Sequence, residues 1–141
     1  MYGFSTTLDT SFEDAINRVT KALGKEGFGI LTEIDVKATL KAKLDIDRKP
    51  YRILGACNPS LAHRAIEADP DIGLLLPCNV VVRKEDNGNI WVGFMDPDAV
   101  LKLADNPDVH ALSREVKARL ERVCDSLKMP LSSSPMVTAA V

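Results

Sequence analysis

The stretch that decides the fold reads Tyr51-Arg52-Ile53-Leu54-Gly55-Ala56-Cys57-Asn58-Pro59. Its first seven residues are mostly apolar and follow a polar segment, a pattern typical of a buried strand. Asn58 is a residue type that caps helix N-termini. Pro59 suits the first helical position because the N–H that it lacks has no partner there. The stretch therefore predicts a strand over residues 51–57 that leads directly into a helix beginning at Pro59.

Downstream, residues 78–84 and 89–95 are predicted to form an antiparallel hairpin. Asn87-Gly88 separates two apolar runs there, and this dipeptide favours the positive φ angles of a tight turn. Asp96-Pro97 is predicted to start a short helix, and Asn106-Pro107 the last helix. The apolar residues of that last helix recur at steps of three and four and define one buried face: Val109, Leu112, Val116, Leu120, Val123 and Leu127.

Upstream, residues 2–8 and 28–34 are predicted to be two further strands. Between them, residues 11–26 show the apolar periodicity of a helix, and Gly27 suits its end. Asp35 is expected to cap a short helix that follows the second strand.

This order of strands and helices predicts an α+β fold. We expect a two-layer sandwich in which an antiparallel sheet of about five strands carries helices on one face. The other face of such a sheet needs cover, which a second copy of the chain could supply. Residues 1–128 are predicted to form this single domain. Residues 129–141 lack periodicity and are predicted to be a C-terminal tail.

The composition is that of a globular protein, with 45% hydrophobic and 27% charged residues among 141. The formal net charge of −2 provides no general attraction for nucleic acid or anionic lipid, so no nucleic-acid partner is expected. Three aspartates dilute the one local basic group, which we interpret as a solvated face: Lys37, Lys41, Lys43, Arg48 and Lys49.

The start of the chain lacks a signal-peptide pattern. The longest apolar run, residues 72–76, is far shorter than the roughly 20 residues that span a bilayer and is interpreted as a core segment. The sequence thus predicts no membrane contact and a cytoplasmic location. Three cysteines are an odd number, which argues against a disulfide framework and favours reduced thiols.

Two short segments suggest chemistry, since each places a thiol beside an asparagine: Cys57-Asn58 and Cys78-Asn79. A thiol just before a helix N-terminus can have a lowered pKa and be reactive or bind metal. The ordinary alternative is that Cys57 closes a buried strand and Asn58 serves only as a cap.

The two thiols lie 21 residues apart, and no Cys-x-x-Cys motif is present. They would meet if the strand ending at Cys57 lies beside the start of the strand at Cys78, and would otherwise be separate core residues. His63 follows Cys57 by six residues and could complete a Cys/His metal site or a thiol–imidazole pair. As an exposed helical histidine it needs no function, and the same holds for His110. Cys124 lies beside the apolar face of the last helix and is expected to pack in the core.

Three features follow one another in a distinctive order: the strand leading into Gly55-Ala56-Cys57-Asn58-Pro59, the run Ile72-Gly73-Leu74-Leu75-Leu76-Pro77-Cys78-Asn79, and the hairpin around Asn87-Gly88. In this order the chain resembles the family called domain of unknown function 302, over roughly residues 1–128. Many members carry Gly-Asn-Pro and Leu-Pro-Leu-Lys forms instead, so the chain is similar to a branch with cysteines.

The resemblance implies a fold like the TATA-binding-protein class, with an antiparallel sheet, helices on one face, and a homodimer. It does not imply DNA binding, because fold and function separate, and it supplies no activity.

Taken together, the sequence predicts a small cytoplasmic homodimeric binding protein. Its pocket would lie at the dimer or sheet edge and be lined by Cys57, Asn58, Cys78 and Asn79, with His63 nearby. The ligand would be a soft metal ion held by Cys57 and Cys78, or a small sulfur-containing or acidic molecule. One alternative is a redox or sulfur-transfer enzyme that uses Cys57 with His63 or Cys78 assisting. The other is a structural or regulatory dimer without a ligand.

Overall fold

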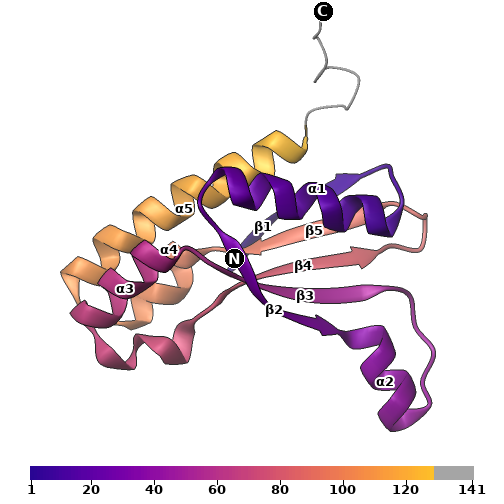
Figure 1. Cartoon of the computed structure of the whole chain (residues 1–141), viewed down its shortest axis with the longest axis horizontal. Helices are drawn as coiled ribbons and strands as arrows, with labels where there is room; N and C mark the ends of the chain where they lie inside the picture. Colours follow the sequence, from indigo (N-terminus) through magenta and orange to yellow (C-terminus); the bar gives the residue numbers. More distant parts are fainter. Residues whose placement is uncertain (129–141) are drawn as a thin grey trace, which may run out of the picture.

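The computed structural model describes residues 1–128, which form one five-stranded antiparallel sheet with the longest helices on one face and one short helix projecting beyond the sheet edge (Figure 1). The strand order is β1-β5-β4-β3-β2, so β1 and β2 are the edges. The strands are β1 (Gly3–Leu8), β2 (Gly29–Asp35), β3 (Tyr51–Cys57), β4 (Cys78–Lys84) and β5 (Ile90–Met95). The helices are α1 (Phe12–Lys25), α2 (Val36–Leu44), α3 (Pro59–Ala68), α4 (Pro97–Val100) and α5 (Pro107–Leu127), with 3-10 turns η1 (Pro70–Leu75) and η2 (Leu101–Leu103). The predicted α+β architecture is confirmed.

Local capping explains where the helices begin. The side-chain oxygen of Asn58 accepts a hydrogen bond from the N–H of Leu61 (3.3 Å), and Pro59 opens α3. Asn106 caps α5 in the same way, accepting from the N–H of Asp108 (2.9 Å). Each side chain satisfies a backbone N–H that the helix itself leaves without a partner.

The turn of the predicted hairpin also forms as expected. Gly88 has a φ of 91°, a left-handed conformation that glycine adopts without a steric penalty. The side-chain oxygen of Asn87 accepts a hydrogen bond from the N–H of Asn89 (2.9 Å) and closes the turn. β4 and β5 then pair antiparallel, with Val82 opposite Val92.

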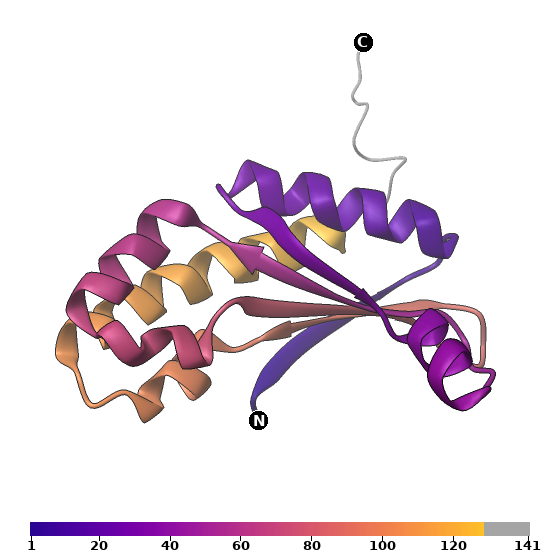
Figure 2. The ribbon, with the colours of Figure 1, turned by 60° about the horizontal axis from the view of Figure 1, so that its bottom comes forward.

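The core lies between the sheet and the layer formed by α1 and α5. Figure 2 shows α1, α3 and α5 on the same face of the sheet. Alternate residues of the strands point into this layer and are almost fully buried: Leu54, Val80, Val82, Ile90, Val92 and Phe94. The side chains between them face the opposite side, which no described element covers. Ile34, Tyr51, Ile53, Val81 and Trp91 lie there and are only partly buried or exposed.

One expectation about the core holds only in part. The apolar run at residues 72–76 contributes Ile72, which is buried, and Leu75 and Leu76, which pack against the core. Leu74, in the 3-10 turn η1, is instead 88% exposed. The physical cause is the Asp69-Pro70 start of the turn, where the Asp69 carboxylate accepts from the N–H of Asp71, because a tight turn cannot bury all of its side chains on one side. The predicted tail, residues 129–141, lies outside the described residues.

Candidate functional site

The register of β3 and β4 brings the two candidate cysteines to the same end of the sheet. Ala56 lies directly opposite Cys78, so Cys57, the last residue of β3, is one residue along its strand from the position opposite Cys78. The helix α3 begins two residues later, at Pro59. Strand pairing therefore places Cys57 and Cys78, which are 21 residues apart in the sequence, at neighbouring positions of the sheet.

Both thiols line a cavity of about 310 Å³ between this end of the sheet, α3 and the first half of α5. Cys78 is buried and Cys57 is half-buried. The remaining walls are almost entirely apolar and include Phe28, Ala56, Leu61, Ala65, Ile66, Leu101, Val109, Leu112 and Val116. A cavity of this size lies at the lower end of the range for small-molecule sites.

Few polar groups reach this cavity, and none of the residues 1–128 that line it has a charged side chain. Asn58 lies at the wall, but its oxygen already caps α3 and its amide nitrogen lies 3.5 Å from the carbonyl oxygen of Glu26, an acceptor. Its side chain thus holds α3 against the turn between α1 and β2. Besides the two thiols and Asn58, the lining residues include one further polar side-chain group, the hydroxyl of Thr32.

The surroundings of the thiols oppose ionisation. Burial raises the pKa of Cys57. The pKa of Cys78 is raised to about 11 by burial, with a further contribution from charge repulsion by Cys57. Of the two interpretations of Cys57, the direction of this pKa shift favours a thiol that closes a strand over an activated thiol, because burial disfavours the thiolate. Both thiols carry their protons at neutral pH.

Two of the predicted site residues do not reach the cavity. Asn79 follows Cys78 in β4, where side chains alternate between faces, so it points to the uncovered face and is exposed. His63 follows Leu61 by two residues, which is about 200° around a helix. It is exposed on α3, away from the side that carries Leu61 and Ala65.

The described residues contain no group of three or more metal-ligating side chains. Within residues 1–128 the cavity therefore offers two protein ligands for a metal, the thiols of Cys57 and Cys78. The other histidine, His110, has its Nε2 2.6 Å from the carbonyl oxygen of Ala104, which makes it a structural contact. Cys124 is buried in the core as expected.

Sequence reasoning missed the α5 wall of the cavity. Val109, Leu112 and Val116 form the apolar stripe that was assigned to the core, and all three also line the cavity. Leu31 was missed as well. It lies at an irregularity of register between Ile30 and Thr32 in edge strand β2. An extra residue in an edge strand changes the direction in which a side chain points. The sequence carries no signal that shows where such an extra residue lies.

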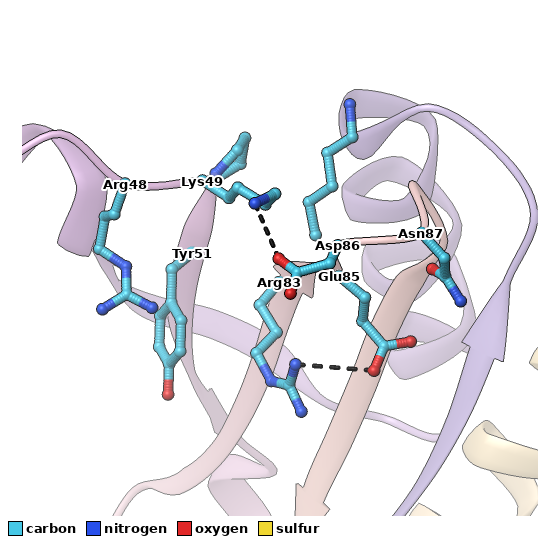
Figure 3. A pocket seen from close by; sticks show the side chains of 9 residues that line it. Arg48, Lys49, Tyr51, Arg83, Glu85, Asp86 and Asn87 are labelled. Atoms are coloured by element: carbon cyan, nitrogen blue, oxygen red, sulfur yellow. Dashed lines mark ion pairs between the residues drawn. The ribbon is translucent and has the colours of Figure 1, made fainter.

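A second, more open depression of about 600 Å³ lies where β3 begins and the β4–β5 hairpin turns (Figure 3). Two of its four cationic side chains are paired, Lys49 with Asp86 (2.8 Å) and Arg83 with Glu85 (3.7 Å), whereas Arg48 and Lys84 have no carboxylate partner among the described residues. The guanidinium of Arg48 lies 5.2 Å from the centre of the Tyr51 ring. The depression therefore carries a net positive charge, which solvent screens because its side chains are open to water.

Within residues 1–128, no helix is both long enough and apolar enough to cross a membrane.

Known proteins match the chain in both sequence and structure. A protein of Aquifex aeolicus (strain VF5) named "Uncharacterized protein" is 27% identical over 94 residues, which cover 58% of this chain and 65% of that protein. The chain thus spans somewhat less than two thirds of that relative. The crystal structure of "uncharacterized conserved protein DUF302 from Bacillus stearothermophilus" superposes with a TM-score of 0.83 and 28% identity, over 91% of this chain and 99% of that one. The family model for "Domain of unknown function DUF302" matches residues 4–127, and the chain therefore belongs to the DUF302 family.

Proposed function

We propose that this protein binds a small, mainly apolar molecule in the cavity lined by Cys57 and Cys78. The observation that carries the proposal is the cavity itself, about 310 Å³ of space with apolar walls and no charged side chain. Such a site gains affinity by removing apolar surface from water. The two protonated thiols supply weak, polarisable contacts to a soft atom of the ligand, such as a thioether or thiol sulfur.

The same walls disfavour an acidic ligand. A carboxylate inside the cavity would lose its hydration without meeting a cationic side chain, since Asn58 is engaged as the cap of α3. The proposal therefore keeps the small sulfur-containing or apolar molecule and sets the acidic one aside.

A soft metal ion is the second candidate, favoured by the presence of two thiols in the lining of one cavity. Thiolates select soft ions such as Cu(I). Both thiols must lose a proton before they bind a metal, and their pKa values are raised, so affinity for Cu(I) would fall as pH falls. The double variant Cys57→Ser/Cys78→Ser would no longer bind Cu(I).

Catalysis by Cys57 is the weaker alternative. A nucleophilic cysteine reacts as the thiolate, whereas burial raises the pKa of Cys57, and His63 does not line the cavity. A structural dimer without a ligand is the remaining alternative.

We also propose that two copies associate through the uncovered face of the sheet, in keeping with the expected homodimer, and that the free thiols reflect the reducing cytoplasm. Five strands about 4.8 Å apart and about six residues long present roughly 500 Å². Two such faces would bury about 1,000 Å², the lower end of specific interfaces.

The test of the cavity uses benzene as probe and ¹H–¹⁵N NMR of the whole chain as readout. Dry apolar cavities bind benzene, so we expect saturable shifts at the amides around Ala56, Cys57 and Ala65. The variant Ala62→Phe places a ring into the cavity from α3 and should abolish these shifts. Ala111→Phe, at an exposed position of α5 outside the cavity, is the matched control and should bind as the natural sequence does.

Absence of saturable shifts in the natural sequence would refute the apolar site. If Cu(I) then binds to the natural sequence and does not bind to the Cys57→Ser/Cys78→Ser variant, the metal site replaces the apolar site as the proposed function. If neither probe binds, the ligand-free dimer is favoured.

A further inference from the structure

We propose that the ligand of this cavity carries an unbranched aliphatic chain, which fills the cavity and leaves it across an apolar rim formed by Leu31 and Ile66. This inference rests on the proposed function and names the ligand class. It goes beyond the size and polarity of the cavity because it also accounts for exposed apolar side chains at its mouth.

The rim consists of two large apolar side chains that are exposed and still line the cavity. Leu31 is 67% exposed and Ile66 is 44% exposed. They come from different elements, the irregular stretch of edge strand β2 and the helix α3. Because apolar wall continues without a charged side chain from the interior to these exposed positions, a ligand confined to the interior would leave the rim in water.

The volume sets the length of chain that the interior holds. About 310 Å³ corresponds to roughly ten water-sized volumes of about 30 Å³ each, and a methylene group is of similar size. The cavity, with the space beside Leu31 and Ile66 included, thus holds about eight to ten carbons. The outer carbons of such a chain would contact Leu31 and Ile66 and cover the rim.

The polarity of the walls decides the head group. In the part of the chain that the structure describes, no charged side chain lines the cavity, and the polar side-chain groups at its wall without a hydrogen-bond partner are the thiols and the Thr32 hydroxyl. These can accept or donate weakly to a neutral oxygen or sulfur, and they do not compensate an ionised carboxylate. The chain therefore ends in a neutral head, or keeps a charged head outside the mouth.

A series of straight-chain alcohols from butanol to decanol tests the inference, with binding followed by ¹H–¹⁵N NMR. Each added methylene should tighten the dissociation constant about fourfold, up to about octanol or decanol. Octanol should bind more tightly than octanoate.

The rim variants separate a chain from a compact ligand. We expect Leu31→Asp and Ile66→Asp to raise the dissociation constant of decanol at least tenfold. The dissociation constants of benzene and butanol should change less than twofold. Leu44 on α2 is a comparably exposed leucine (62%) that does not line the cavity. The control variant Leu44→Asp should therefore leave all three dissociation constants unchanged. Both rim positions are exposed, and Leu31→Ser with Ile66→Ser provides a milder pair if the aspartates perturb the amide spectrum.

The outcomes distinguish the two proposals. If benzene binds and Ala62→Phe abolishes its binding, the apolar site stands. The aliphatic chain is nevertheless refuted if the affinity for alcohols stops rising at butanol, or if the rim variants weaken the binding of benzene and of decanol equally. If benzene and all alcohols fail to bind, both proposals fall.

Discussion

Trp91 lies over Gly93 on the uncovered face of the sheet, with the guanidinium carbon of Arg83 4.3 Å from its ring centre. A Cβ on Gly93 would overlap the six-membered part of that ring. At this position glycine is required by the close approach of a side chain, since the backbone itself is ordinary strand.

The change Gly93→Ala should displace the Trp91 ring and lower the free energy of unfolding by about 1–3 kcal/mol, as overpacking does. Trp91 is the only tryptophan of the chain, so its emission maximum reports the displacement. Gly29→Ala in β2 is the control, because nothing lies within 4 Å of the added Cβ. Equal emission and stability in both variants would contradict the expected overlap.

The buried thiol of Cys78 predicts a loss of stability at high pH. The unfolded chain releases this proton near the ordinary pKa of 9.0, whereas the folded chain releases it at about 11. The native state therefore binds more protons in this range, and stability falls as pH rises from about 9 to 11. The two-unit shift corresponds to about 3 kcal/mol.

Denaturant titrations of the natural sequence and of Cys78→Ala between pH 8 and 11 measure this loss. Since the two proteins share every other ionisable group, the difference between their slopes isolates Cys78. Parallel pH profiles would show that the thiol is not shielded from water.

At the scale of elements, short polar caps do more than start helices. Asn106 caps α5 and also donates from its amide nitrogen to the carbonyl oxygen of Ala68 at the end of α3 (2.9 Å). One side chain thus joins the two helices that form opposite walls of the cavity. Asn58 has the corresponding position between α3 and the carbonyl of Glu26.

We expect Asn106→Ala to cost about 1–2 kcal/mol of unfolding free energy, because it removes the cap and leaves the Ala68 carbonyl without this donor. Asn106→Asp keeps the capping oxygen and loses only the donor, so it should cost less. Urea denaturation measures both. A larger loss in the aspartate variant than in the alanine variant would mean that capping is not the main contribution.

At the scale of the whole molecule, the sheet has one packed face and one uncovered face. If two copies associate through the uncovered face, the particle mass is about 31 kDa, twice the chain mass of 15.4 kDa. A charge in the centre of that face should prevent association, because burying an unpaired carboxylate is costly.

Sedimentation equilibrium should therefore show a dimer for the natural sequence and a monomer for Val81→Glu. Asn17→Glu, at an exposed position of α1 on the opposite side of the sheet, should remain a dimer. A natural sequence that sediments at the chain mass would refute the association.

The sequence by itself determined the elements and their order. Asn58-Pro59, Asn106-Pro107 and Asn87-Gly88 are local signals, in which a side chain satisfies or a glycine permits the backbone of its own neighbours. Such signals act over a few residues, and the periodicity of α5 adds its buried face. For this reason the α+β architecture was predictable.

Only the tertiary structure decided what those elements enclose. That Cys57 and Cys78 line one cavity depends on the register of β3 and β4, and the exposed Leu31 depends on an irregularity in an edge strand. The raised pKa of Cys78 depends on burial by residues distant in sequence. Register, enclosure and desolvation are sums over contacts between separate segments, so no local pattern encodes them.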